Sequence, residues 1–162
     1  MNLVLFRHGV AVERGTKGIA DDDRPLTEEG RRRTREAARG ARRLGLGIDR
    51  IVTSPLPRAK ETAAILARAL GLKAPGEDAR LASEPEDILA LVGELKGTCP
   101  ALVGHEPTLG QVLSRLVFGG DGGAFRFKKA GLAHVELHGP ASGRRGTLLL
   151  FAGPSVLRRL GR

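Results

Sequence analysis

An arginine and a histidine stand directly after a short apolar run at the start of the chain, in the sequence Arg7-His8-Gly9. A planar guanidinium matches the oxygens of a phosphate group, and a histidine nitrogen can attack phosphorus or carry a proton. The following glycine lets a ligand approach the backbone closely. This pattern is typical of an anion site, although a single tripeptide of this kind also occurs in exposed loops.

Two further polar groups follow apolar runs in the same way. In residues 54–58, Pro57 suits the first position of a helix, which places Arg58 in the first turn. A cation there opposes the helix dipole and calls for a neighbouring anion, which favours phosphate binding. His105 follows Gly104 at the end of the apolar run 101–103. It can donate to a phosphate oxygen or serve as a hydrogen-bonded structural histidine.

The apolar runs before these motifs predict buried strands at 2–6, 51–52 and 101–103. Helical spacing and capping signals predict a first helix that begins after Thr27 and ends at Gly45 or Gly47. Three further helices are expected over about 57–70, 85–95 and 107–117. Two further strands are expected near 131–137 and 147–152, joined by a glycine-rich turn at 139–146 and followed by a short helix.

This alternation of strands and helices predicts an α/β fold, a three-layer α/β/α sandwich with a mostly parallel central sheet. Ligands bind beyond the carboxyl ends of the strands in such sheets. Arg7-His8, residues 54–58 and His105 all follow strands, so we expect them to share one site. Neither an internal repeat nor a long linker is visible, and we expect one domain over residues 1–162.

The composition limits the classes of partner. The net charge is +9, but the chain has no Trp or Tyr and only five Phe on which bases could stack, so we do not expect a nucleic-acid partner. The charge fits a solvated helix face over residues 31–43 or a field that attracts anionic substrates. The absence of a long apolar run excludes a membrane span. Arginine outnumbers lysine, and Asn and Gln each occur once, which hints at a thermophile or a GC-rich source.

The cysteine and histidine content predicts neither a disulfide nor a metal site. Cys99 is the one cysteine, which fits a cytoplasmic setting and a structural role for that residue. His134 and His138 are accompanied by no cluster of carboxylates or cysteines, so we interpret them as surface or core residues. We expect no metal and no cofactor.

Taken in order and spacing, four motifs resemble the histidine phosphatase superfamily, which includes the cofactor-dependent phosphoglycerate mutases and the bacterial phosphohistidine phosphatases. The resemblance covers about residues 1–160. The motifs are Arg7-His8-Gly9, Arg24-Pro25-Leu26-Thr27 with Gly30 three residues later, Ser54-Pro55 followed by Arg58-Ala59, and Gly104-His105.

The resemblance implies a phosphoglycerate mutase-like fold and a role for each matched residue. His8 would be the catalytic nucleophile that becomes phosphorylated, and Arg7, Arg58 and His105 would hold the phosphoryl oxygens. Arg24 would contact the substrate or its phosphate, or would instead pair with the acidic residues 21–23.

The chain departs from the superfamily where many members supply a carboxylate general acid. Arg80 stands just before Leu81, where a glutamate is expected. Glu84 and Asp78 are the nearby candidates for a general acid, and Glu84 is equally explained as an acid at a helix N-terminus.

The short chain lacks room for the insertions of larger relatives and is most similar to the compact SixA type of phosphohistidine phosphatase. That type implies a metal-independent enzyme whose substrate is the phosphohistidine of a signalling protein. Two alternatives stay open: a small-molecule phosphomonoesterase on the same scaffold, and a non-catalytic module that binds a phosphorylated ligand.

Overall fold

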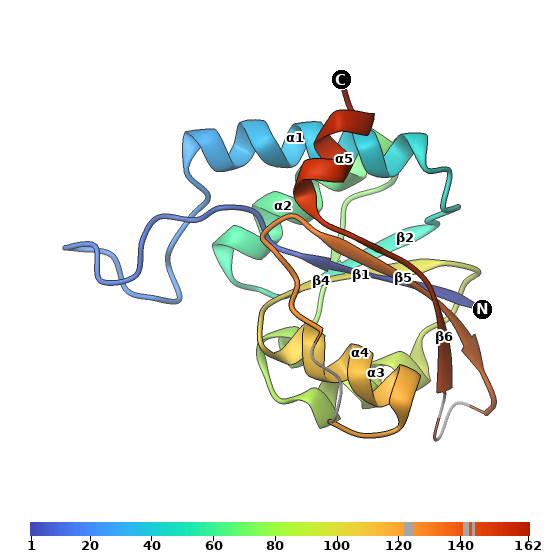
Figure 1. Cartoon of the computed structure of the whole chain (residues 1–162). Helices are drawn as coiled ribbons and strands as arrows, with labels where there is room; N and C mark the ends of the chain where they lie inside the picture. Colours follow the sequence, from blue (N-terminus) through green and yellow to red (C-terminus); the bar gives the residue numbers. More distant parts are fainter. Residues whose placement is uncertain (122–124, 141–142, 144) are drawn as a thin grey trace.

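The computed structural model describes residues 1–121, 125–140, 143 and 145–162. Within these residues a six-stranded sheet runs through the middle of the molecule, with strand order β3-β2-β4-β1-β5-β6 (Figure 1). The neighbours among β1 to β4 pair in parallel, and β5 and β6 add an antiparallel hairpin next to β1. The strands are β1 (Asn2–Arg7), β2 (Arg50–Thr53), β3 (Gly76–Glu77), β4 (Pro100–Gly104), β5 (Leu132–His138) and β6 (Arg145–Ala152).

Helices cover both faces of the sheet and form the outer layers (Figure 1). On one face lie α1 (Glu28–Arg43), α2 (Pro57–Leu70) and α5 (Pro154–Leu160), and on the other lie α3 (Pro85–Glu94) and α4 (Thr108–Phe118). Side chains of β1 alternate between the faces, as a strand requires. Val4 and Phe6 join the core beneath α1 and α2, whereas Leu3 and Leu5 join the core beneath α3 and α4. The predicted three-layer sandwich with a mostly parallel sheet is confirmed.

Local signals account for most helix boundaries. The Thr27 hydroxyl accepts a hydrogen bond from the Gly30 backbone N–H at 2.9 Å and so caps α1. Pro57 opens α2, and Gly71 ends it in a left-handed conformation that favours glycine. Helix α1 ends at Arg43 with Leu44 as its C-cap, and Gly45 follows in a left-handed conformation, so the predicted stop at Gly45 is confirmed. The turn predicted at 139–146 includes residues 141, 142 and 144, which lie outside the described residues.

Three residues singled out in the sequence lie away from the carboxyl ends of the parallel strands. Cys99 and His134 are buried, and His138 is exposed on β5. Among the described residues, no group of three or more His, Cys, Asp or Glu side chains is placed to hold a metal ion. None of the described helices is long and apolar enough to cross a bilayer.

Candidate active site

A cavity of about 390 Å³ opens where β1 and β4 end at the same edge of the sheet. Arg7 ends β1, His8 follows it, and His105 follows β4. Arg58 reaches the cavity from the first turn of α2, and Arg24 reaches it from the loop before α1. The structure therefore brings Arg7, His8, Arg24, Arg58 and His105 to one cavity.

The ring of His8 is held by its own backbone neighbour. His8 is only 6% exposed, and its Nδ1 lies 2.7 Å from the carbonyl oxygen of Gly9. Because a carbonyl oxygen can only accept, this contact requires the proton on Nδ1 and leaves the lone pair of the neutral ring on Nε2. A ring with that tautomer offers Nε2 as a nucleophile.

The backbone of Gly9 is fixed in turn by α2 and lies close against α1. Its backbone N–H donates to the Thr62 hydroxyl at 3.0 Å, and that hydroxyl donates to the Arg58 carbonyl oxygen at 2.7 Å. A side chain on residue 9 would collide with the Thr34 hydroxyl, so the position requires glycine. The sequence offers no signal for Thr62, because its place on the buried face of α2 is that of an ordinary core residue.

The guanidinium groups of Arg7, which is half-buried, and of Arg58, which is buried, are only partly hydrogen-bonded. Nη1 of Arg7 donates to the Phe127 carbonyl at 2.6 Å, and Nη1 of Arg58 donates to the Asp21 carbonyl at 2.9 Å. The Nε atoms of both are buried without a hydrogen-bond partner among the described residues. Since unpaired buried donors cost free energy, the arrangement suits an anion that supplies the missing acceptors.

Arg24 combines the two roles that the sequence left open. Its Nε donates to Asp21 Oδ1 at 2.8 Å and its Nη1 donates to the Val12 carbonyl at 2.7 Å, while the side chain lines the cavity. The ion pair with Asp21 orients the guanidinium, so pairing does not withdraw Arg24 from the site.

His105 lies close to His8, with ring centroids 5.1 Å apart. Its Nε2 is 2.8 Å from the Ser54 hydroxyl, whereas its Nδ1 is buried and has no hydrogen-bond partner among the described residues. Ser54 therefore fixes the ring from one side. This contact links the segment after β2 to the segment after β4.

Both histidines are neutral at physiological pH. Burial lowers the pKa of His8 to about 3, assisted by the nearby His105, Arg7 and Arg58 and opposed by the hydrogen bond to Gly9. Burial lowers the pKa of His105 to about 4, again assisted by Arg58 and Arg7. Desolvation and neighbouring positive charge both disfavour the imidazolium form, so the Nε2 lone pair of His8 stays available.

The two carboxylates predicted as general acids are not among the residues that line the cavity. Asp78 accepts from the Arg80 backbone N–H at 3.0 Å and pairs with its guanidinium at 2.8 Å, which holds the pKa of Asp78 low. Glu94 also binds Arg80, at 3.0 Å. Glu84 is the N-cap residue of α3. Glu84 thus lies at a helix N-terminus, which is the alternative to a general acid that the sequence left open.

Two other carboxylates line the cavity instead, Glu13 and Glu106. Burial raises the pKa of Glu106, although the backbone N–H groups of Phe127 and Gly110 bind it and Arg7 lies nearby. The sequence held one signal for Glu106, its place directly after His105 at the end of a strand. Glu13 lies in a loop whose path the sequence does not define.

The lowered pKa of His8 predicts that its ring does not titrate between pH 8 and pH 5. A histidine with the ordinary pKa of 6.5 would take up a proton across that range, whereas a pKa near 3 keeps the ring neutral throughout. NMR of the ring carbon and nitrogen resonances, assigned by comparison with His8→Asn, measures this directly. A titration midpoint between pH 6 and pH 7 would contradict it.

Comparisons with known proteins identify the family. The profile of the histidine phosphatase superfamily (branch 1) matches residues 3–83. An uncharacterized protein of Picosynechococcus sp. is 39% identical over 137 residues, which are 82% of this chain and 82% of that protein.

Two solved structures are similar over nearly the whole chain. The protein histidine phosphatase SixA in complex with tungstate has a TM-score of 0.76 at 26% identity, covering 97% of this chain and 99% of that chain. A candidate phosphohistidine phosphatase SixA from Agrobacterium tumefaciens has a TM-score of 0.78 at 25% identity, covering 94% and 97%. The chain belongs to the histidine phosphatase superfamily, and its fold is the phosphoglycerate mutase-like fold of SixA.

Proposed function

We propose that this protein is a phosphatase that forms a covalent phosphohistidine on His8, and that its substrate is a phosphohistidine of a signalling protein. The observation that carries the proposal is the state of His8: a buried neutral ring with its proton held on Nδ1 by the Gly9 carbonyl. Arg7 and Arg58, each with an unpaired buried donor, lie in the same cavity.

In the first proposed step, Nε2 of His8 attacks phosphorus while the bond from phosphorus to the leaving group breaks. The electron pair of that bond goes to the leaving group, which takes up a proton from solvent water. In the second step, water attacks the phosphoryl group, the bond from phosphorus to Nε2 breaks, and inorganic phosphate leaves with His8 restored. Arg7 and Arg58 offset the negative charge on the equatorial oxygens in both transition states.

The similar structures support this assignment. Two are named as SixA phosphohistidine phosphatases or candidates for that activity, and one of them binds tungstate, a tetrahedral oxyanion like phosphate. We propose that Arg7, Arg58 and His105 hold the phosphoryl oxygens here and that Arg24 contacts the substrate beside them. The reaction proposed in this way uses only groups of the protein and water.

The choice of substrate depends on the leaving group. An alkoxide is strongly basic and must be protonated as it leaves, whereas the imidazole of a phosphohistidine can be protonated near neutral pH and leave as a neutral ring. Arg80, Asp78 and Glu94 form an ion-paired group outside the cavity, so the usual position of the general acid offers none here. This favours phosphohistidine as the substrate.

One observation favours the second candidate function, a small-molecule phosphomonoesterase. Glu106 lines the cavity, and burial raises the pKa of its carboxyl group above the usual value. A carboxyl group that keeps its proton more readily is better suited to protonate an alkoxide. Glu106 would then be the general acid.

A series of leaving groups separates the two functions. We expect kcat/KM to be higher on a phosphohistidine peptide and on an aryl phosphate than on an alkyl phosphate by roughly 10²–10⁴-fold, the usual contribution of a general acid. Glu106→Gln should leave the order unchanged. Similar values on all three substrates, together with a selective loss on alkyl phosphate in Glu106→Gln, would establish the phosphomonoesterase instead.

Replacing Arg58 tests the proposed phosphate contact. Arg58→Ala should lower kcat/KM on an aryl phosphate by about 10²–10³-fold, because a charged group that stabilises the transition state is lost. Arg68→Ala is the matched control, since it removes an exposed arginine from the last turn of the same helix. If the two variants have the same activity, Arg58 does not act on the phosphoryl group.

A further inference from the structure

A second cavity of about 330 Å³ adjoins the candidate active site. Arg7, Val10 and Lys129 line both cavities, so the two lie side by side at these residues. Its other charged lining residues are Arg33, Lys128 and Arg158, and no carboxylate is among the residues that line it. All the charged residues that line the second cavity are therefore positive.

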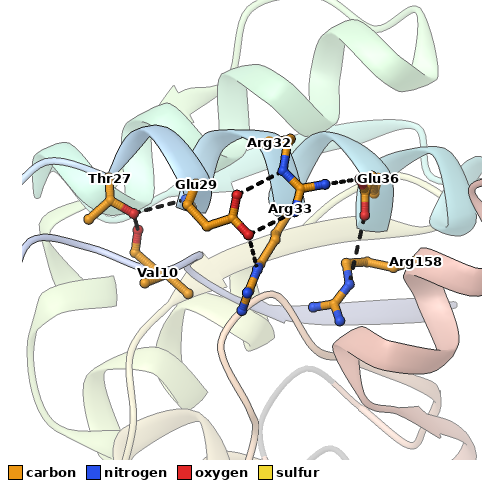
Figure 2. A network of polar contacts seen from close by, with 8 residues as sticks. Val10, Thr27, Glu29, Arg32, Arg33, Glu36 and Arg158 are labelled. Atoms are coloured by element: carbon orange, nitrogen blue, oxygen red, sulfur yellow. Dashed lines mark hydrogen bonds and ion pairs between the residues drawn. The ribbon is translucent and has the colours of Figure 1, made fainter.

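Two of its cations come from helices that pack together. Arg33 lies on α1 and Arg158 on α5, and Figure 2 shows both guanidinium groups extending from their helices toward the same region. Arg33 pairs with Glu29 at 2.6 Å, and Arg158 lies 3.8 Å from Glu36.

The ion pairs around these helices do not balance. Glu29 also binds Arg32 at 2.7 Å, and Glu36 binds Arg32 at 2.6 Å. Arg32, Arg33 and Arg158 thus share two carboxylates, which leaves one positive charge in excess.

The lysines of the second cavity increase this excess. Lys128 and Lys129 are exposed, and no carboxylate oxygen of the described residues lies within 4 Å of either ammonium group. Partial desolvation and the positive charges of Arg7 and Arg24 lower the pKa of Lys129, and the carboxylate of Glu13 opposes this shift. An anion bound in the second cavity would relieve the repulsion among these cations.

We propose that the second cavity is a subsite for an acidic side chain that neighbours the phosphorylated residue of a substrate protein. This inference rests on the proposed function, because it assumes that the phosphoryl group lies at His8. Sites for small ligands are usually enclosed, because most of the ligand's surface is buried when it binds. Exposed cations such as Arg33 and Lys128 instead suit carboxylates carried on a protein surface.

The subsite speeds the association of the substrate protein with the enzyme and favours its productive orientation. Complementary charges raise the association rate and disfavour wrong partners more than they raise affinity. The preference for substrates with acidic neighbours should therefore be seen in kcat/KM. It should decrease as salt is added, since exposed charges are screened.

The test uses two phosphohistidine peptides that differ only in carrying Asp or Asn on both sides of the phosphorylated residue. The wild-type protein should favour the acidic peptide by on the order of tenfold in kcat/KM, from contributions of roughly two- to fivefold for each exposed charge pair. The double variant Arg33→Gln and Lys128→Gln should lose most of this preference. Its turnover of an aryl phosphate, which has no second anionic group, should not change.

The matched control is the double variant Arg35→Gln and Lys73→Gln. It removes the same two charges from exposed residues that line neither cavity, one of them on the same helix as Arg33. It should keep the full preference for the acidic peptide. Equal rates on the two peptides in the wild type, or a preference that survives in the double variant Arg33→Gln and Lys128→Gln, would overturn the subsite.

Failure of the proposed function has a different outcome. In that case the wild type hydrolyses the aryl phosphate but neither peptide. The same sequences, carrying a stable phosphohistidine analogue, then serve as competitive inhibitors of aryl phosphate hydrolysis. Tighter inhibition by the acidic peptide, lost in the double variant Arg33→Gln and Lys128→Gln, would still support the subsite, and equal or absent inhibition would overturn it.

Discussion

One hydrogen bond determines which nitrogen of His8 carries the lone pair, and much of the surrounding structure holds that bond in place. The Gly9 carbonyl accepts from Nδ1, while the Gly9 N–H donates to Thr62, whose hydroxyl donates to the Arg58 carbonyl. The tautomer of His8 and the placement of Arg58, the residues that we propose as nucleophile and phosphate ligand, therefore depend on the same turn of α2. The low pKa of His8 completes the arrangement, because burial and neighbouring cations keep the ring neutral.

The first turns of α2 also connect the site to the loop before α1. Glu61 accepts from the Leu26 backbone N–H at 3.0 Å and from Nε of Arg31 at 2.6 Å. Arg58 donates to the Asp21 carbonyl, and the Asp21 carboxylate orients Arg24. The loop before α1 and helix α2 thus hold each other in place through Arg58 and Glu61, which lie within one turn of α2. Arg7 and Arg58 donate to backbone carbonyls, which carry no charge, so these contacts leave the positive charge of both guanidinium groups for a substrate to neutralise.

The sequence predicted much of the fold because its signals are local. Apolar runs marked β1, β2 and β4, and Pro57 with Gly71 marked both ends of α2. The rule that parallel strands end at one edge was enough to bring His8, Arg58 and His105 together. These signals need no knowledge of how distant segments pack.

Features that depend on packing between distant segments could not be predicted. Glu84 was a candidate because it is near the expected position in sequence, but the short helical turn capped by Asp78 intervenes before α3. Glu106 lines the cavity and accepts hydrogen bonds from the backbone of residues 110 and 127, and no local sequence pattern predicts these contacts. The second cavity depends on the packing of α1 against α5, whose residues are far apart in the chain.

The most direct test of the account is to trap the phosphorylated intermediate. The protein is mixed with an aryl phosphate labelled in the phosphoryl group, quenched within milliseconds into alkali, and mapped by mass spectrometry. We expect an acid-labile phosphoryl group on Nε2 of His8, formed in less time than one turnover, and none in His8→Ala, which should also lack activity. Stable label on another residue, or full turnover by His8→Ala, would contradict it.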